Sequence, residues 1–167
     1  QAFQVSTRAL NLKSANFRIS GSAPADATAN VGMYIDGVKA GNNATMTYRN
    51  GSNYLTFDMS SMPVSLTTGT HTMEIRTDIV KGSSFSFTVS LQSASDIMIM
   101  DPQVGVNLVV GSFVASSGTT VTVGTGSFTA SNDPAFSALT TTTAAASNAT
   151  IAKFKIHGYG EDVKVTS

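Results

Sequence analysis

The sequence contains no cysteine, only two histidines, and only 12% charged residues among its 167 positions. Without cysteine the chain has no disulfides, no thiolate metal ligands and no cysteine nucleophile. Two histidines and two glutamates leave little from which to build a zinc site or a nucleophile–base triad. The phosphate-binding glycine motifs and the nucleophile-elbow motif are also absent. The composition therefore argues against an enzyme, and no cofactor is expected.

The chain also lacks net charge and long apolar runs. Its formal net charge is zero, so electrostatics give no reason to expect nucleic acid or an anionic membrane as partner. No run of 18 apolar residues occurs, so no transmembrane segment is expected. Serine and threonine fill most polar positions, which suits an extracellular, cell-surface β protein or one that packs against its own copies. A cytosolic protein is the alternative.

The stretch from Thr70 to Val110 organises the expected fold. Apolar and polar residues alternate from Met73 to Thr77 and again from Phe85 to Leu91. Alternation at period two predicts strands that bury one face and expose the other. The turn Lys81-Gly82-Ser83 between them predicts a hairpin. Its inward side chains need a second apolar sheet, so an antiparallel β-sandwich is expected.

Turn and break patterns divide the rest of the chain into short strands. The pairs Asp36-Gly37 and Asn50-Gly51 predict two-residue hairpin turns. The apolar residues switch from even positions at Leu10 and Leu12 to odd positions at Phe17 and Ile19. This switch predicts a bulge or break near Ser14-Ala15. No stretch of ten residues shows a 3.6-residue apolar period. These features predict an all-β protein of many short strands.

Three segments resemble a known family: VGMYIDG at 31–37, GTHTMEIRTDIVKGSSFSFTVSLQSASDI at 69–97, and IAKFKIHGYGEDVKVTS at 151–167. They are similar to the Ig-like repeats in large cell-surface proteins of candidate-phyla bacteria, the Parcubacteria and their relatives. The resemblance implies an S-layer-like or adhesive surface protein and brings no catalytic residues. The expected fold class is all-β, an Ig-like antiparallel β-sandwich with additional C-terminal strands.

The C-terminal segment looks like the start of another repeat, because Val163 and Val165 fall on Leu10 and Leu12 when the two ends are aligned. The expected division is a sandwich at 1–130, an Ala/Thr/Ser-rich linker or loop at 131–150, and strands at 151–167 that begin a second repeat or are exchanged. Strands without partners expose an edge that another copy can cover. The expected subunit interface is Ile151, Phe154, Ile156, Val163 and Val165. In the alternative, these strands close their own sandwich.

Acidic residues and histidines are the candidates for a metal site. Hard oxygen ligands could hold calcium between adjoining domains, and the candidates are Asp96, Asp101, Glu161 and Asp162. The alternative is an ordinary role at turns, strand ends or charge pairs. His71 and His157 are expected at solvated strand or loop positions.

Three sequons and four tyrosines are candidates for contact with sugars. Asn43, Asn50 and Asn148 each begin an N-x-S/T motif in an expected turn or linker, where a glycan could attach. Aromatic rings could also stack on a sugar in a groove, or they could be plain strand and turn residues. These rings are Tyr34, Tyr48, Tyr54 and Tyr159.

Two non-enzymatic hypotheses follow. The first is an extracellular structural protein, a self-assembling subunit of a cell-surface filament, pilus or S-layer held together by β-strand pairing between subunits. The alternative is an adhesin-type module that recognises glycan or protein, or a subunit of a virion or tail fibre. Assembly and glycan binding are measurable separately, so experiment can tell the two apart.

Overall fold

The computed structural model describes residues 1–137, 144–145 and 147–159. The chain divides into two compact units, Gln1–Val123 and Gly124–Ser167. The expected boundary at 130 falls inside a strand of the second unit, β14 (Ser127–Asn132). Every strand pair is antiparallel. The first unit is a β-sandwich, as the sequence predicts.

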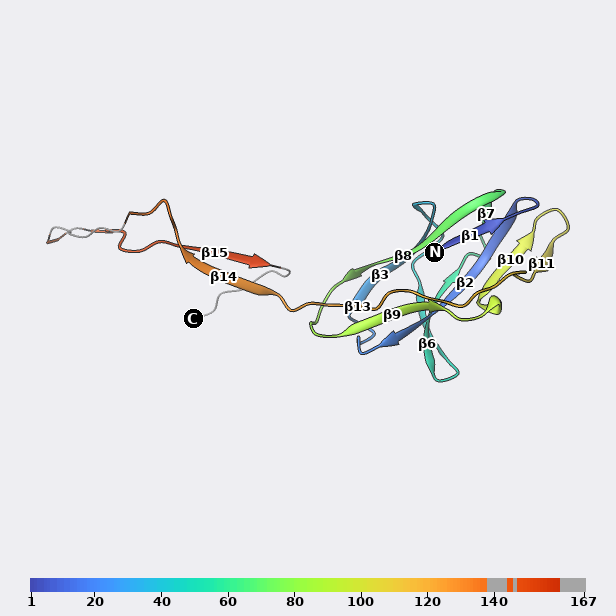
Figure 1. The fold of residues 1–167 in the computed structure, drawn as a ribbon, viewed down its shortest axis with the longest axis horizontal. Helices are drawn as coiled ribbons and strands as arrows, with labels where there is room; N and C mark the ends of the chain where they lie inside the picture. The colour runs from blue at the N-terminus through green and yellow to red at the C-terminus, as the bar shows by residue number, and fades with distance from the viewer. Residues whose placement is uncertain (138–143, 146, 160–167) are drawn as a thin grey trace. The chain divides into compact units, whose positions relative to one another are not determined.

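One layer of the sandwich is a four-stranded sheet in the order β1-β8-β3-β4. Figure 1 shows β3 and β8 running side by side. Met33 and Ile35 of β3 point into the core, while Tyr34 between them points outward, as strand alternation requires. The bounds of these strands are Ala2–Val5 for β1, Thr28–Ile35 for β3, Val38–Lys39 for β4 and Gly69–Ile79 for β8.

The other layer is built around the long strand β2, which pairs with β6 and β7 along one edge and with β10 and β9 along the other. Strand β5 lies outside β6, β11 outside β10, and β12 and β13 outside β9. The bounds are Leu10–Gly21 (β2), Thr45–Arg49 (β5), Ser52–Asp58 (β6), Val64–Leu66 (β7), Ser86–Leu91 (β9), Ile97–Asp101 (β10), Val106–Leu108 (β11), Ser116–Ser117 (β12) and Val121–Thr122 (β13), with a 3-10 turn at Ala94–Asp96.

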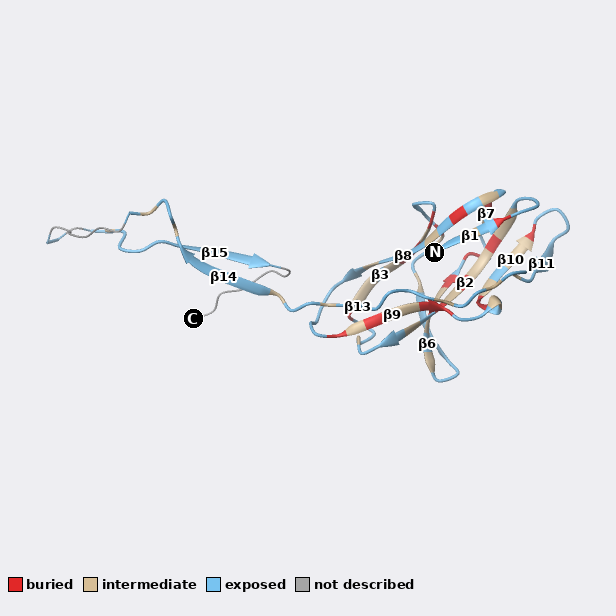
Figure 2. Ribbon diagram, in the orientation of Figure 1, coloured by how far each residue is buried: buried red, intermediate tan, exposed pale blue. Residues whose placement is uncertain are grey.

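The core lies between these layers and draws on both. Leu12, Phe57 and Met33 are nearly inaccessible to solvent. Phe17 and Phe57 meet edge to face with their ring centroids 6.0 Å apart, a favourable aromatic arrangement. A smaller cluster of Ala27, Phe85 and Phe87 fills one end of the unit. Figure 2 shows the buried residues distributed over the sandwich strands.

Both predicted hairpin turns are present. Asp36 and Gly37 have φ of 50° and 81°, and Asn50 and Gly51 have φ of 48° and 74°. Two consecutive positive φ angles define a type I′ turn, which matches the twist of the flanking strands. The first turn joins β3 to β4 and the second joins β5 to β6.

A β-bulge in β2 accounts for the switch from even to odd inward-facing positions. Met98 of β10 lies opposite Ser14, but Ile99 lies opposite Leu12, so Lys13 is the extra residue. A bulge shifts the alternation by one, and Leu12 and Ala15 therefore both face the core. The bulge falls one residue before the predicted position.

The predicted central hairpin is wrong. Strand β8 pairs with β1 and β3 in one sheet, whereas β9 pairs with β2, β12 and β13 in the other. Gly82 and Ser84, with φ of 89° and 61°, lie in a connection that crosses between the two sheets. Phe85 anchors this connection in the smaller apolar cluster.

In the described part of the second unit, β14 pairs with β15 (Phe154–Tyr159) to form a two-stranded sheet. Ser131 and Asn132 were expected in a linker, but they end β14 because they pair with Lys155 and Phe154. One of the strands expected within 151–167 is therefore present, and its partner among the described residues is a strand of the same unit.

Candidate functional site

The β14–β15 hairpin is amphipathic. Phe128 lies opposite Gly158, Ala130 opposite Ile156, and Asn132 opposite Phe154. Residues directly opposite each other share a face of the sheet. Four of the six residues on this face are apolar, namely Phe128, Ala130, Phe154 and Ile156. The other face is mainly polar and carries Ser127, Thr129, Ser131, Lys155, His157 and Tyr159.

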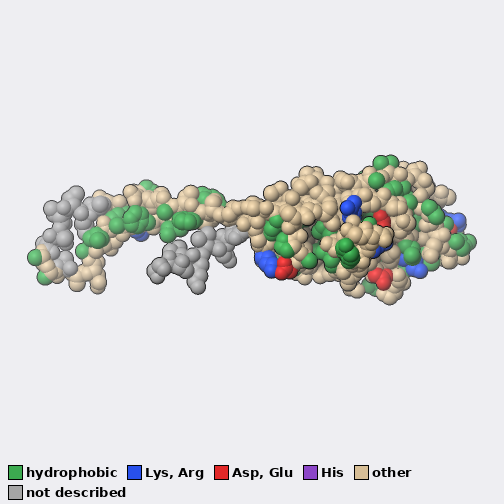
Figure 3. Space-filling view, turned by 90° about the horizontal axis from the view of Figure 1, so that it is seen from below, with side chains coloured by type: hydrophobic (Ala, Val, Ile, Leu, Met, Phe, Trp, Pro, Cys, Tyr) green, Lys and Arg blue, Asp and Glu red, His purple; other side chains and the backbone are tan. Residues whose placement is uncertain are grey.

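The apolar face of the hairpin is open to solvent. Phe128 is 61% exposed, Phe154 66% and Ile156 54%. Figure 3 shows hydrophobic side chains gathered along this part of the chain. Among the residues that the structure describes in this unit, no second layer of strands covers the face, and an isolated hairpin is only marginally stable in water. The face is therefore a candidate contact surface.

Polar contacts also stabilise the hairpin beyond the backbone hydrogen bonds between β14 and β15. The Asp133 N–H donates to the Lys153 carbonyl at 3.0 Å, and the Lys153 ammonium lies 3.1 Å from the Asp133 carboxylate. On the polar face, the rings of His157 and Tyr159 stack with centroids 4.4 Å apart. These contacts favour the paired strands and leave the apolar face free for another partner.

The predicted interface residues are only partly placed by the structure. Phe154 and Ile156 lie on the apolar face, and Ile151 lies before β15 and is 79% exposed. Val163 and Val165 lie outside the described residues. Sequence reasoning missed the contribution of β14, although the alternation Phe128, Ala130 was visible within its serine- and threonine-rich strand.

Asp96 and Asp101, the described calcium candidates, are both paired with arginines. Asp96 is 4% exposed, accepts a hydrogen bond from the Arg49 guanidinium, and accepts another from the Ser93 N–H at 3.0 Å. This second bond is half of a capping box on the 3-10 turn.

Asp101 is 1% exposed and lies 2.8 Å from the Arg8 guanidinium. It also accepts the Gln103 N–H at 2.9 Å. A buried carboxylate requires a partner of this kind, so both aspartates have a structural role as charge pairs. Glu161 and Asp162 lie outside the described residues. Within 1–137, 144–145 and 147–159, no three metal-ligating side chains come together.

His71 is not at the solvated position that was expected. It is 8% exposed, and its Nδ1 lies 2.6 Å from the Asp36 carboxylate and its Nε2 2.8 Å from the Thr67 carbonyl. The hydrogen bond with Asp36, followed by the one with Thr67, raises the pKa of His71. The same contact with His71, together with the Thr72 N–H, lowers the pKa of Asp36. The pair ties the β3–β4 turn to β8.

The three sequons are accessible. Asn43, Asn50 and Asn148 are all exposed. The Asn43 side chain is engaged, because its Oδ1 accepts from the Lys39 ammonium at 2.6 Å, whereas Asn50 lies at the tip of the β5–β6 turn. Attachment of a glycan stays a prediction, with Asn50 the more accessible acceptor of these two.

The tyrosines of the sandwich do not form a shared groove. Tyr34 lies on the outer face of the first sheet beneath the Arg76 guanidinium, 4.2 Å from the ring centroid. Tyr54 lies on the second sheet beneath Arg49, at 4.1 Å. Tyr48, which is 73% exposed, points to the opposite face of its sheet from Tyr54. Stacking on arginine accounts for two of these rings.

No family model, no curated protein and no solved structure matches this chain. Over the part of the chain that the structure describes, no helix has the length and hydrophobicity to span a membrane. The surfaces of the molecule are therefore the basis for a functional conclusion.

Proposed function

We propose that this chain is a non-enzymatic structural subunit that assembles with copies of itself at the cell surface, as a filament, pilus or S-layer. The observation that carries the proposal is the open apolar face of the β14–β15 hairpin. Exposed hydrophobic faces of this kind mark sites of protein contact. Within the described residues, the outer edges of β14 and β15 pair with no further strand, and unpaired strand edges pair readily with other chains.

The energy available from covering this face is sufficient to support association. A fully covered aromatic side chain removes roughly 150–250 Å² from water, and each Å² contributes about 25 cal/mol. Covering the exposed parts of Phe128 and Phe154 therefore contributes on the order of 5 kcal/mol before the cost of association is subtracted. Main-chain pairing at the hairpin edge adds specificity in register and direction.

The low charge of the chain supports the same proposal. With 12% charged residues and a net charge of zero, like subunits experience little mutual repulsion. Serine- and threonine-rich surfaces can also approach one another without burying unpaired charges. An extracellular location follows from this composition and from the family resemblance, and belongs to the same proposal.

Electron microscopy and light scattering of the full chain test assembly directly. The wild-type protein is expected to form polymers whose mass rises with concentration. The double variant Phe154→Ser/Ile156→Ser is expected to remain monomeric because it removes half of the apolar face. Lys155→Ser, on the polar face of the same strand, is the matched control and is expected to assemble. Dispersed wild-type monomers at every concentration would refute the proposal.

A further inference from the structure

Asn50 is the only one of the ten asparagines in the chain that is followed by glycine. When the backbone nitrogen of the next residue attacks the side-chain amide carbon of an asparagine, a five-membered ring closes. A side chain on that next residue hinders the attack, and glycine has none. The pair Asn50-Gly51 therefore combines the two groups that this reaction needs, whereas every other asparagine precedes a residue with a side chain.

The structure leaves both groups of this pair accessible. Asn50 and Gly51 form the tip of the β5–β6 hairpin and are exposed, and Figure 1 shows this hairpin projecting from the sandwich. A Cβ on Gly51 would have no atom within 4 Å apart from those of its chain neighbours, so the tip has room for a ring and for water. Among the described residues, neither the Asn50 side chain nor the Gly51 N–H has a hydrogen-bond partner.

Hydrogen bonds hold the side chains of other asparagines near the same sheets. Asn30 donates to the Asp78 carboxylate at 2.8 Å, and Asn43 accepts from the Lys39 ammonium at 2.6 Å. A side-chain amide that is held in this way keeps one orientation. The Asn50 amide has no such restraint, so it is free to turn toward the backbone nitrogen of the next residue.

We propose that Asn50 is a self-modification site, at which attack by the Gly51 nitrogen converts the asparagine into aspartate or isoaspartate. A bond forms between the Gly51 nitrogen and Cγ of Asn50, the bond from Cγ to Nδ2 breaks, and the Gly51 amide proton leaves with the side-chain nitrogen as ammonia. Water then opens the cyclic imide. Addition of water at Cγ gives aspartate, and addition at the backbone carbonyl carbon gives isoaspartate, in which the main chain runs through Cβ and Cγ. The reaction requires no partner molecule, so it is independent of the proposed self-assembly.

The hairpin turn controls how fast the ring closes. In the type I′ turn, the backbone at Asn50 and Gly51 has φ of 48° and 74°, and the peptide plane between them must rotate before the nitrogen can reach Cγ. Glycine adopts both signs of φ readily, so it permits this rotation. Strand β5 is exposed along its whole length and lies at the edge of its sheet, where local opening is easiest. The reaction therefore needs local opening of the turn and no unfolding of the sandwich.

The two products have different consequences for the hairpin. Aspartate followed by glycine fits a type I′ turn, so this product keeps the hairpin and adds a negative charge to a chain whose formal net charge is zero. Isoaspartate lengthens the turn by a backbone carbon. The adjacent Arg49, which lies opposite Ser52, would then be displaced from Asp96, a carboxylate that is 4% exposed. A buried carboxylate that loses its partner destabilises the fold.

Peptide mapping of the full-length, unglycosylated protein during storage in mildly alkaline buffer tests the site, because alkali promotes attack by the backbone nitrogen. The peptide that contains Asn50 is expected to gain the mass difference between an amide and an acid, and fragmentation is expected to place isoaspartate at this position. Gly51→Ala is expected to slow the reaction at least about tenfold, equivalent to about 1.4 kcal/mol of activation free energy. Asn148 is also exposed and has φ of 55°, but it precedes Ala149. It is the internal control and is expected to react at least about tenfold more slowly than Asn50.

Urea denaturation of stored protein tests the structural consequence. Wild-type protein enriched in isoaspartate is expected to unfold at a lower urea concentration than fresh protein, whereas Asn50→Asp, which keeps an Asp-Gly turn, is expected to match fresh wild type. Equal midpoints for fresh and isoaspartate-containing protein would refute the displacement of Arg49 from Asp96. Modification of Asn50 no faster than that of Asn148, or at an unchanged rate in Gly51→Ala, would overturn the proposal. The comparison of the two asparagines within the wild type decides the question even if Gly51→Ala fails to fold.

Discussion

His71 lies between two acceptors, the Asp36 carboxylate and the Thr67 carbonyl, at the end of the inward face of β8. A histidine can donate from both ring nitrogens only when it is protonated. The geometry therefore favours the charged imidazolium despite its burial, and this is why its pKa is raised. Sequence reasoning missed the pair because Asp36 was interpreted only as a turn residue.

The His71–Asp36 pair makes stability depend on pH. His71 has a pKa above its ordinary value of 6.5, so its contribution is fully present below about pH 6.5 and is lost as the pH rises through the raised pKa. Asp36 has a pKa below 3.8, so its contribution is present above about pH 4 and is lost as the pH falls through the lowered pKa. Chemical denaturation should show the wild type more stable at about pH 6 than at about pH 9.

The two histidines provide a matched comparison for that measurement. His71→Gln should remove most of the loss between the two pH values, because glutamine does not titrate there. His157→Gln, on the exposed polar face of the hairpin, should retain the wild-type dependence. Parallel profiles for wild type and His71→Gln would contradict the role assigned to the pair.

Alanine substitutions of Phe57 and Phe128 should have different effects on stability, because one side chain packs in the core and the other is exposed on the hairpin. Phe57 is 1% exposed and packs against Phe17, so Phe57→Ala should cost about 3–5 kcal/mol of unfolding free energy. Phe128 is 61% exposed, so Phe128→Ala should change the stability of the sandwich by less than about 1 kcal/mol. Urea denaturation of both variants checks these values. Similar losses in the two would show that the hairpin face is covered within the monomer.

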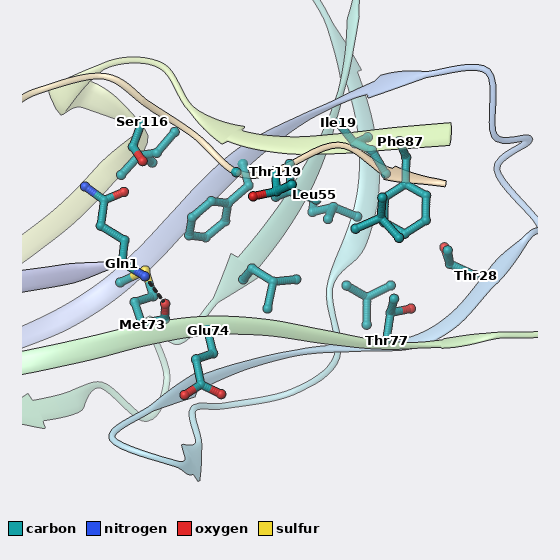
Figure 4. A pocket seen from close by; sticks show the side chains of 17 residues that line it. Gln1, Ile19, Thr28, Leu55, Met73, Glu74, Thr77, Phe87, Ser116 and Thr119 are labelled. Carbon is teal, nitrogen blue, oxygen red and sulfur yellow. Dashed lines mark hydrogen bonds between the residues drawn. The ribbon is translucent and has the colours of Figure 1, made fainter. Parts of the chain in front are cut away.

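Secondary structure was predictable from local chemistry, but strand partners were not. The turns at Asp36-Gly37 and Asn50-Gly51 are specified by residues that tolerate positive φ. Alternation in 73–77 and 85–91 correctly predicted two strands, yet period two says nothing about which sheet a strand joins. Met73, Ile75 and Val89 remain only partly buried, because they line a cavity of about 420 Å³ between the two sheets (Figure 4).

Replacing glycine by alanine should destabilise the protein to different extents at a strand junction (Gly21) and at a hairpin turn (Gly37). Gly21 has φ of 134°, and a Cβ there would lie 2.2 Å from the Ser86 carbonyl oxygen. That carbonyl accepts from the Ser22 N–H at 2.9 Å, so neither chain can move without breaking the contact between β2 and β9. Gly37 has φ of 81° and open space around it.

Gly37→Ala should therefore lower the unfolding free energy only by the strain of placing alanine in a left-handed backbone conformation, about 1–2 kcal/mol. Gly21→Ala should cost more, because a backbone clash is added to an unfavourable φ. Thermal and urea unfolding of the two variants compare them directly. An equal or smaller loss for Gly21→Ala would show that the β2–β9 junction adjusts freely.

At the scale of the whole molecule, period-two alternation and turn residues predicted an all-β sandwich with additional C-terminal strands. The structure contains the sandwich and, within the residues that it describes, one of those strands. The division into units was harder to predict, because Ser131 and Asn132 look like linker residues until Lys155 and Phe154 are known to pair with them. Ion pairs between distant segments, such as Arg8 with Asp101, leave no local pattern in the sequence.

The first unit should fold without the second. Both buried clusters are made of residues within 1–123, so a chain of residues 1–123 should unfold cooperatively with a midpoint close to that of the sandwich in the full protein. It should also be monomeric by sedimentation, because it lacks the hairpin. Deleting only 151–167 should likewise give a folded, soluble monomer. Global unfolding of either truncated chain would show that the C-terminal strands belong to the sandwich.

The exposed apolar face of the hairpin gives the proposed filament a direction. Two copies of the same face that paired with each other would close a dimer, so growth of a filament requires the hairpin to meet a different surface of the next copy. The two ends of such a filament are unlike, and subunits can add at each end at a different rate. A chain of residues 1–123 lacks the hairpin, so it could add at one end only and would stop growth there. A minor fraction of it in a preparation would set the length of the filaments.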